Sequence, residues 1–246
     1  GLSIVQNMYT PSTTKTGGIK IGDRPYAAYL YAGFFKITND PARDFRMTSE
    51  LDLGIIGPDS YGEWVQRSFH NSVPTNNEPL GWEYQIRNDL ILNYSLAMQK
   101  GLISTGHLEV IATAKGNLGT LYTNLSGGIF LRTGWLNSWF ASPLPLTKRE
   151  ISEQGNNSRP FQACLFLKAN SQLVGYDATL QGGMFDHNSD YTIPDSDISR
   201  AVFNGSAGLS LEYRGIGLDL EQFLLSPEFD GGMWHKWVHI ALKFSL

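Results

Sequence analysis

Apolar and polar residues alternate along most of this chain, in segments of a dozen residues or more. Between residues 121 and 135, Leu125, Ile129 and Leu131 share one parity, while Asn124 and Arg132 share the other. A period of two is typical of β-strands that have one apolar and one polar face. The sequence therefore predicts an all-β antiparallel protein, with about ten or eleven strands between its turn signals.

Two architectures fit this periodicity. In a soluble sandwich or a lipocalin-like binder the apolar face forms the core, whereas in a membrane barrel it meets lipid and the polar face fills the interior. The predicted strands are close to the roughly 9–11 residues that cross a bilayer. Short turns also alternate with long polar loops, as in outer-membrane barrels. Both observations favour the membrane barrel.

Composition removes several other classes of protein. The net charge of −4 gives no basic surface for nucleic acid. No run approaches the roughly 18 apolar residues of a membrane helix, so a helical membrane protein is excluded. Cys164 is the single cysteine, so it cannot form an internal disulfide, and no Cys/His spacing resembles a zinc site. We expect residues 1–246 to form a single β-barrel domain.

One irregular segment, residues 57–70, interrupts the alternation. Gly57-Pro58 follows a predicted strand, and proline ends its hydrogen-bond ladder. Ser60 and Glu63 have the spacing of a capping box, in which each side chain bonds the backbone N–H of the other residue. The spacing predicts a short helix that begins at Ser60.

Three polar side chains share one face of this predicted helix. Glu63, Gln66 and His70 are separated by three and four residues. A neutral imidazole can take a proton from water, and Glu63 could orient that imidazole, which fits a hydrolytic site. The alternative interpretation is a capping helix with a solvated polar face. A Gly-x-Ser-x-Gly elbow is missing from the sequence, which disfavours a serine hydrolase of that class.

Two further predictions concern strand boundaries. Alternation from Trp82 to Met98 predicts one long strand. The Asn170-Ser171 pair lies between two alternating segments and predicts a hairpin turn there.

Four stretches carry a resemblance to a known family. They read Tyr9-Thr10-Pro11, Asp23-Arg24-Pro25-Tyr26-Ala27-Ala28-Tyr29-Leu30-Tyr31, Gly57-Pro58-x-Ser60-x-Gly62-Glu63-x-x-Gln66-x-x-x-His70 and Gly81-Trp82-x-x-Gln85. In this order and spacing they resemble the lipid A 3′-O-deacylase family of Gram-negative outer membranes. A fifth stretch, Ser226-Pro227-Glu228-Phe229, is similar to the family's approach to its last strand.

The resemblance implies a fold and an activity. The fold is an outer-membrane β-barrel of about twelve strands with a short helix at one rim. The activity is a calcium-dependent hydrolase that removes the 3′-linked acyloxyacyl group from lipid A, which modifies lipopolysaccharide. The protein is then expected to be a monomer among outer-membrane lipids, with no nucleic-acid partner.

The resemblance also implies roles for individual residues. His70 matches the family's general base, with Glu63 beside it in the motif and Gln66 contacting the substrate. Lys15 is the nearest match to the family's oxyanion-stabilising lysine, and Lys20, also a candidate for substrate binding, is the alternative. The resemblance assigns no metal ligand in this sequence.

The sequence departs from the family pattern in one respect. Family members begin with a strand that bears an Asn-Asp pair, followed by a strand of the Tyr-Thr-Asn-Gly type, and in the sequence given neither strand is found before Tyr9-Thr10-Pro11. We therefore expect the barrel to lack the family's first strands. The alternative function is a catalytically silent outer-membrane barrel with a lipid-binding or scaffold role.

Overall fold

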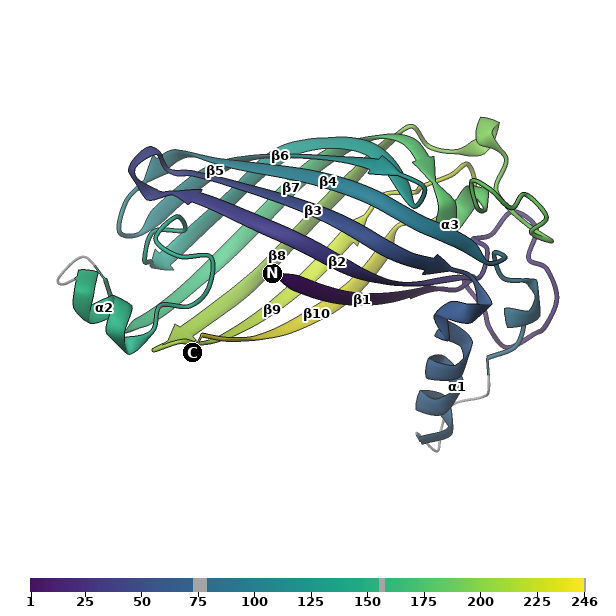
Figure 1. The fold of residues 1–246 in the computed structure, drawn as a ribbon, viewed down its shortest axis with the longest axis horizontal. Helices are drawn as coiled ribbons and strands as arrows, with labels where there is room; N and C mark the ends of the chain where they lie inside the picture. The colour runs from purple at the N-terminus through teal and green to yellow at the C-terminus, as the bar shows by residue number, and fades with distance from the viewer. Residues whose placement is uncertain (73–78, 155–157, 246) are drawn as a thin grey trace.

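The computed structural model describes residues 1–72, 79–154 and 158–245. Within these residues, ten strands form one curled antiparallel sheet in sequence order (Figure 1). The strands are β1 (Leu2–Tyr9), β2 (Ala27–Asp40), β3 (Phe45–Ile56), β4 (Asp89–Ser104), β5 (Leu108–Gly119), β6 (Tyr122–Trp135), β7 (Phe161–Asp177), β8 (Ala201–Tyr213), β9 (Ile216–Leu225) and β10 (His235–Phe244). The all-β antiparallel barrel prediction is confirmed.

The helices lie outside the sheet and are short. They are η1 (Pro41–Arg43), η2 (Pro58–Ser60), α1 (Gly62–Ser72), η3 (Trp82–Tyr84), α2 (Lys148–Gln154), α3 (Ala178–Gln181) and η5 (Asp195–Asp197), where η marks a 3-10 helix. None of the helices in the described part of the chain is long and apolar enough to cross a bilayer.

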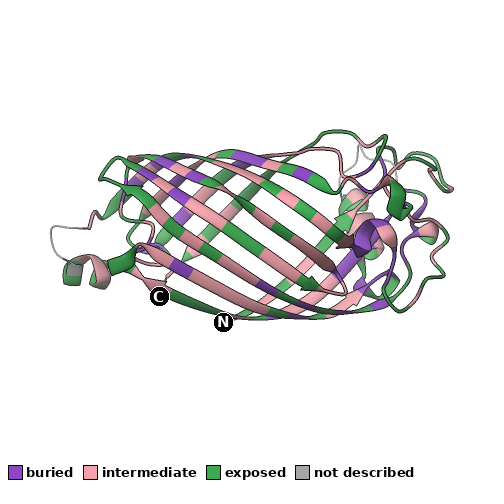
Figure 2. Ribbon diagram, turned by 90° about the horizontal axis from the view of Figure 1, so that it is seen from above, coloured by how far each residue is buried: buried purple, intermediate pink, exposed green. Residues whose placement is uncertain are grey.

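The outer wall of the barrel is apolar, as the alternation predicts. Exposed and less exposed residues alternate along the strands (Figure 2). Leu125 on β6 is 60% exposed and Ile240 on β10 is 64% exposed. Large apolar side chains that face outward without partners need an apolar solvent, which lipid supplies.

The inner face is polar and packed. Arg132 of β6 donates to Glu109 of β5 at 2.5 Å, and Lys168 of β7 pairs with Glu221 of β9 at 2.8 Å. Cys164 is buried on this inner face, as its parity predicts. Charged side chains are tolerated inside a barrel because they meet each other rather than lipid.

The predicted strand from Trp82 to Met98 is wrong in its first half. Residues 82–84 form η3, and β4 begins only at Asp89. Trp82 is fully buried, and it packs at 5.0 Å between ring centroids against Tyr26. Its apolar character reflects this contact rather than a place in the sheet.

The predicted hairpin around Asn170-Ser171 is also wrong. These residues lie in the middle of β7, which runs unbroken for 17 residues. Asn170 points inward, where its side-chain oxygen accepts a hydrogen bond from the Thr113 hydroxyl at 2.9 Å. Of this polar pair, Asn170 belongs to the polar inner face, whereas Ser171 is exposed.

The long connections gather mainly at one end of the barrel. Residues 10–26, 57–72, 79–88, 178–200 and 226–234 lie there, and we call this end the loop-rich rim. α1 and α3 lie at this rim, whereas α2 lies at the opposite end (Figure 1). Long loops are typical of the extracellular end of an outer-membrane barrel.

The two edge strands of the sheet are β1 and β10. No pairing between them occurs among the described residues. An edge that faces lipid leaves backbone groups unpaired. The expectation that the family has further strands at this place stays a prediction.

Candidate active site

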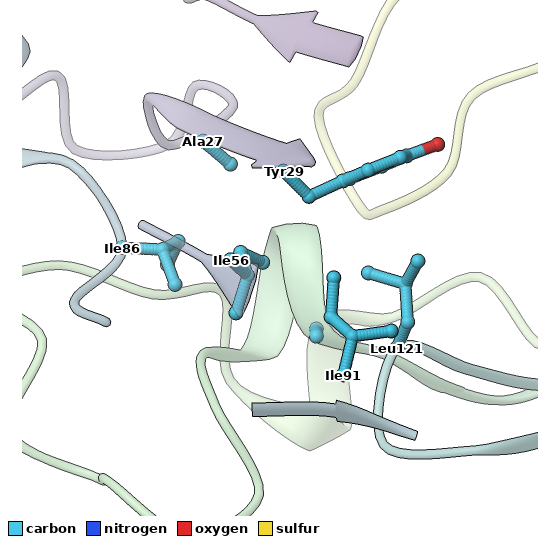
Figure 3. Packing of buried hydrophobic residues seen from close by; sticks show 7 residues of the cluster. Ala27, Tyr29, Ile56, Ile86, Ile91 and Leu121 are labelled. Carbon is cyan, nitrogen blue, oxygen red and sulfur yellow. The ribbon is translucent and has the colours of Figure 1, made fainter. Parts of the chain in front are cut away.

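The motif stretches, distant in sequence, meet at the loop-rich rim. A buried apolar cluster fills the barrel mouth there (Figure 3). Its members are Ala27 and Tyr29 of β2, Ile56 of β3, Ile86, Ile91 of β4, Leu121 and Ala178 of α3. The cluster joins the ends of several strands to the segment after η3, so it fixes the base on which the site is built.

A tight turn directs the chain from β3 into α1. Gly57 has φ 109°, which a residue with a side chain rarely adopts, and its N–H donates to the Ala28 carbonyl at 2.8 Å. Both the N–H and the hydroxyl of Ser60 donate back to the Gly57 carbonyl, at 3.0 and 2.6 Å. The predicted capping box is therefore wrong: Ser60 belongs to η2, and α1 begins at Gly62.

The first turn of α1 rests on the outside of the barrel wall. Ala28 and Met8 lie on the face of the sheet opposite the buried cluster. A Cβ on Gly62 would lie 2.2 Å from the Ala28 Cβ and 3.2 Å from the Met8 side chain. Gln6 Nε2 donates to the Ser60 carbonyl at 2.6 Å. The glycine of the Gly62-Glu63 motif thus permits close contact between helix and wall.

Gln66 is held from the side by η3. Its Oε1 accepts a hydrogen bond from Trp82 Nε1 at 2.6 Å. Tyr26 packs on Trp82 and donates its hydroxyl proton to the Leu80 carbonyl at 2.7 Å. Burial, followed by the nearby Glu83 carboxylate, raises the pKa of Tyr26, which keeps this donor protonated.

Glu63 and His70 share the polar face of α1 with Gln66 but lie at its two ends. They are separated by two helical turns, about 10.5 Å along the axis. Glu63 pairs with Arg67 at 2.8 Å. Arg67 lies between Glu63 and His70 on this side of the helix, and an orienting role of Glu63 toward His70 stays a prediction. His70 itself is half-buried, and its ring lies edge-on to Phe69 at 6.3 Å between centroids.

The two candidate lysines lie on the neighbouring loop, residues 12–22. Lys15 is exposed, and Lys20 Nζ donates to the Thr16 hydroxyl of the same loop at 2.6 Å. The loop is joined to the segment before η3 because Leu80 N–H donates to the Thr14 carbonyl at 2.9 Å. Both lysines thus belong to the same rim as α1, and their roles stay predictions.

A buried ion pair, which the sequence reasoning missed, joins the first and last motif stretches. Arg24 of Asp-Arg-Pro-Tyr pairs with Glu228 of Ser-Pro-Glu-Phe and donates to the Thr179 hydroxyl at 2.7 Å. Burial lowers the pKa of Arg24, but Glu228, Asp177 and the neighbouring tyrosines together outweigh this, and the net pKa is raised. The guanidinium also lies 4.1 Å from the centre of the Tyr9 ring. The sequence did offer one sign of this pair, since two separate motif stretches contain residues of opposite charge, Arg24 and Glu228.

A calcium site requires several oxygen ligands that lie close together. Calcium takes six to eight oxygen ligands, usually with several carboxylates. Among the described residues, no group of three or more His, Cys, Asp or Glu side chains lies close enough to hold a metal ion. On α1 the Glu63 carboxylate is already paired with Arg67. The described carboxylates therefore do not form a calcium-binding cluster by themselves, and calcium binding stays a prediction.

Comparisons with known proteins agree with this architecture. The family model described as outer membrane protein LpxR matches residues 1–246. Among solved structures, LpxR from Salmonella typhimurium superposes with a TM-score of 0.79 at 21% sequence identity. The match covers 100% of this chain and 82% of that one. At this identity the structural likeness supports the fold. The curated proteins give no match.

Proposed function

The chain belongs to the LpxR family of bacterial outer membrane proteins, and from this premise we propose that it is a lipid A deacylase. The proposed substrate is lipid A within lipopolysaccharide. The proposed reaction is hydrolysis of the 3′-linked acyloxyacyl ester, which the motif resemblance suggests.

The observation that carries the proposal is the position of α1. The helix that bears His70 begins on the outer surface of the wall, at the loop-rich rim. An outer-leaflet lipid places its ester groups near water while its acyl chains stay in the bilayer. A histidine on the outside of the wall at that height can meet such an ester without extracting the lipid.

In the proposed reaction, His70 acts as the general base. Its neutral imidazole takes a proton from water as the water oxygen bonds to the ester carbonyl carbon. The carbonyl electron pair moves to oxygen, where the ammonium of Lys15, or of Lys20, stabilises the negative charge. The intermediate then breaks its bond to the alcohol oxygen, which receives the proton back from His70. The products are a free fatty acid and a sugar hydroxyl.

Gln66 and Glu63 have supporting roles in this proposal. Trp82 fixes the orientation of the Gln66 amide, so the amide NH₂ group is available to a substrate oxygen. Glu63 forms an ion pair with Arg67, and in this proposal it acts through Arg67 rather than directly on the His70 imidazole. Glu63 is therefore a positioning residue for the polar face of α1.

Calcium dependence is part of the proposal only as an expectation from the family resemblance. The described residues do not form a carboxylate cluster. Adding a chelator to the folded protein, and then restoring calcium, tests the dependence directly. Recovery of activity with calcium but not with magnesium would support it, whereas full activity in chelator would remove it.

The proposed function is tested by mass spectrometry of lipid A after incubation with the folded protein. The expected product has lost one acyloxyacyl group, with an equal amount of free fatty acid released. Unchanged lipid A, in the presence and absence of calcium, would instead support the silent outer-membrane barrel.

A further inference from the structure

Three aromatic rings on α1, or immediately before it, are exposed. Tyr61, immediately before the helix, is 64% exposed, Trp64 is 67% exposed and Phe69 is 63% exposed. Phe69, five residues after Trp64, is offset from it by about 140° around the helix axis, and Tyr61 precedes the helix with a left-handed φ of 59°. Rings of this size left open to water on a short helix indicate a surface that has an apolar partner.

The orientation of the aromatic side is fixed by a contact on the polar side. Gln66 bonds Trp82 of η3, so the polar side of α1 is turned toward η3. Trp64 lies about 160° around the helix from Gln66, because 100° per residue separates successive side chains. Trp64 is therefore turned away from η3, whereas Phe69, three residues after Gln66, lies only about 60° around the axis from it.

The axis of α1 runs across the barrel axis rather than along it. Figure 1 shows the helix extending outward from the loop-rich rim, across the long axis of the barrel. The axis of an outer-membrane barrel lies close to the bilayer normal. The helix consequently runs along the membrane surface.

The aromatic side is continuous with the lipid-facing wall. Met8, which contacts the start of α1 at Gly62, is 38% exposed on the outer side of β1. Ile4, on the same side of that strand, is 75% exposed. Ile4 and Met8 therefore connect the wall to the start of the helix, and Gln6, between them on this side of β1, is the polar residue of the three.

We propose that α1 lies in the outer-leaflet interface, with Trp64 inserted among the lipids, Tyr61 and Phe69 at the margins of the inserted side, and the polar side turned to the head groups. Amphipathic helices take this position, with the apolar side buried about 5–10 Å into the boundary between head groups and acyl chains. Trp and Tyr are also the residues enriched at that depth. The partner is the lipid surface rather than a second copy of the chain, since the surface is continuous with the wall that already meets lipid. This inference concerns membrane contact and does not depend on the proposed hydrolysis.

The test uses single-cysteine labelling of the full chain in phosphatidylcholine–phosphatidylglycerol vesicles. Trp64→Cys and Phe69→Cys are each labelled with the environment-sensitive dye NBD. Glu83→Cys, an exposed position on η3 at the same rim, is the aqueous control, and Val238→Cys on the outer wall is the lipid control. Cys164 is buried, and labelling of the parent chain measures its background.

The proposal expects lipid-like signals at both helix positions. Emission from labels at 64 and 69 should shift to the blue, be quenched by nitroxide-bearing lipids and be protected from iodide in water, as at position 238. Labels at 64 and 69 that behave like the label at 83 would overturn the proposal. Protection from iodide that depends on protein concentration, without quenching by lipid nitroxides, would also overturn it and identify a second copy as the partner. Correct folding of each variant is checked by its heat-modifiable mobility on a gel.

Discussion

Gln66 Oε1 accepts a hydrogen bond from Trp82 Nε1 at 2.6 Å, which joins α1 to η3 across the outer wall of the barrel. Trp82 is fully buried, so its indole N–H has a fixed direction. The bond connects two motif stretches, of which one ends at His70 and the other begins at Gly81. It determines which side of α1 faces η3, and therefore where His70 lies.

Removing this hydrogen bond should reduce activity without unfolding the barrel. Trp82→Phe keeps a ring against Tyr26 but removes the donor, and loss of one such bond costs roughly 0.5–1.5 kcal/mol. We expect fatty-acid release from lipid A to fall in Trp82→Phe and in Gln66→Ala. The double variant should lose no more than the more affected single variant, because both changes remove the same bond. Losses that add would show that the two side chains act independently.

Close contact between α1 and the wall should also be essential. A Cβ at residue 62 would lie 2.2 Å from the Ala28 Cβ, so Gly62→Ala must move the helix away from the wall. A displacement of this size should lower fatty-acid release about tenfold or more, since reacting groups lose their alignment. The control is Gly127→Ala on β6, where the nearest atom to the new Cβ is 3.7 Å away. Equal activity in the two variants would contradict the role assigned to this contact.

The strands could be predicted from sequence because both faces of a barrel wall impose a period of two. Leu125, Ile129 and Val238 have the exposed positions that their parity predicts. The predicted turn at Asn170 was wrong because polar residues such as Asn are typical of chain reversals. Here the inside of the barrel is itself polar, and Asn170 lies on that inner face. The same periodicity could not distinguish lipid from water outside, and the family match supplied that distinction.

The candidate site was less predictable because it depends on contacts between distant loops. The spacing of Gln66 and His70 showed that they share a side of one helix, but it could not show that Trp82 fixes that side. Trp82 fits the alternating pattern of the following strand in the sequence, although it lies in η3 and packs against Tyr26 on the outside of the wall. The pairing of Arg24 with Glu228 needed the whole fold, since 204 residues separate them.

The Arg24–Glu228 pair should contribute to stability more than a surface pair does. The two side chains are only 12% and 24% exposed, so Glu228→Gln leaves the Arg24 charge poorly solvated. We expect a loss of about 1–3 kcal/mol, below the roughly 3–5 of a fully buried pair. The matched control, Glu153→Gln, breaks the Arg149 pair on α2, whose side chains are 87% and 60% exposed, and should cost little.

Thermal unfolding in detergent, followed by the circular dichroism of the sheet, measures both effects. A midpoint that falls in Glu228→Gln but not in Glu153→Gln is expected. Equal midpoints for the two variants would show that the buried pair adds nothing to the stability of the rim.

The oxyanion prediction is tested on the loop at residues 12–22. If Lys15 stabilises the oxyanion, Lys15→Ala should lower turnover by about 10²–10³ in a folded protein. If turnover is retained in Lys15→Ala and lost in Lys20→Ala, the role belongs to Lys20. Full activity in both variants would limit the loop to a structural role, in which Thr14 supports Leu80.

The central claim is that His70 on α1 is the general base of a lipid A deacylase. The most direct measurement is the rate of fatty-acid release from lipid A by the full, detergent-folded chain with calcium present, compared between the parent, His70→Ala and His187→Ala. His187 is an exposed histidine at the same rim and controls for the loss of an imidazole. We predict release by the parent and by His187→Ala, and almost none by His70→Ala although it folds. Equal release by the parent and His70→Ala would contradict the claim.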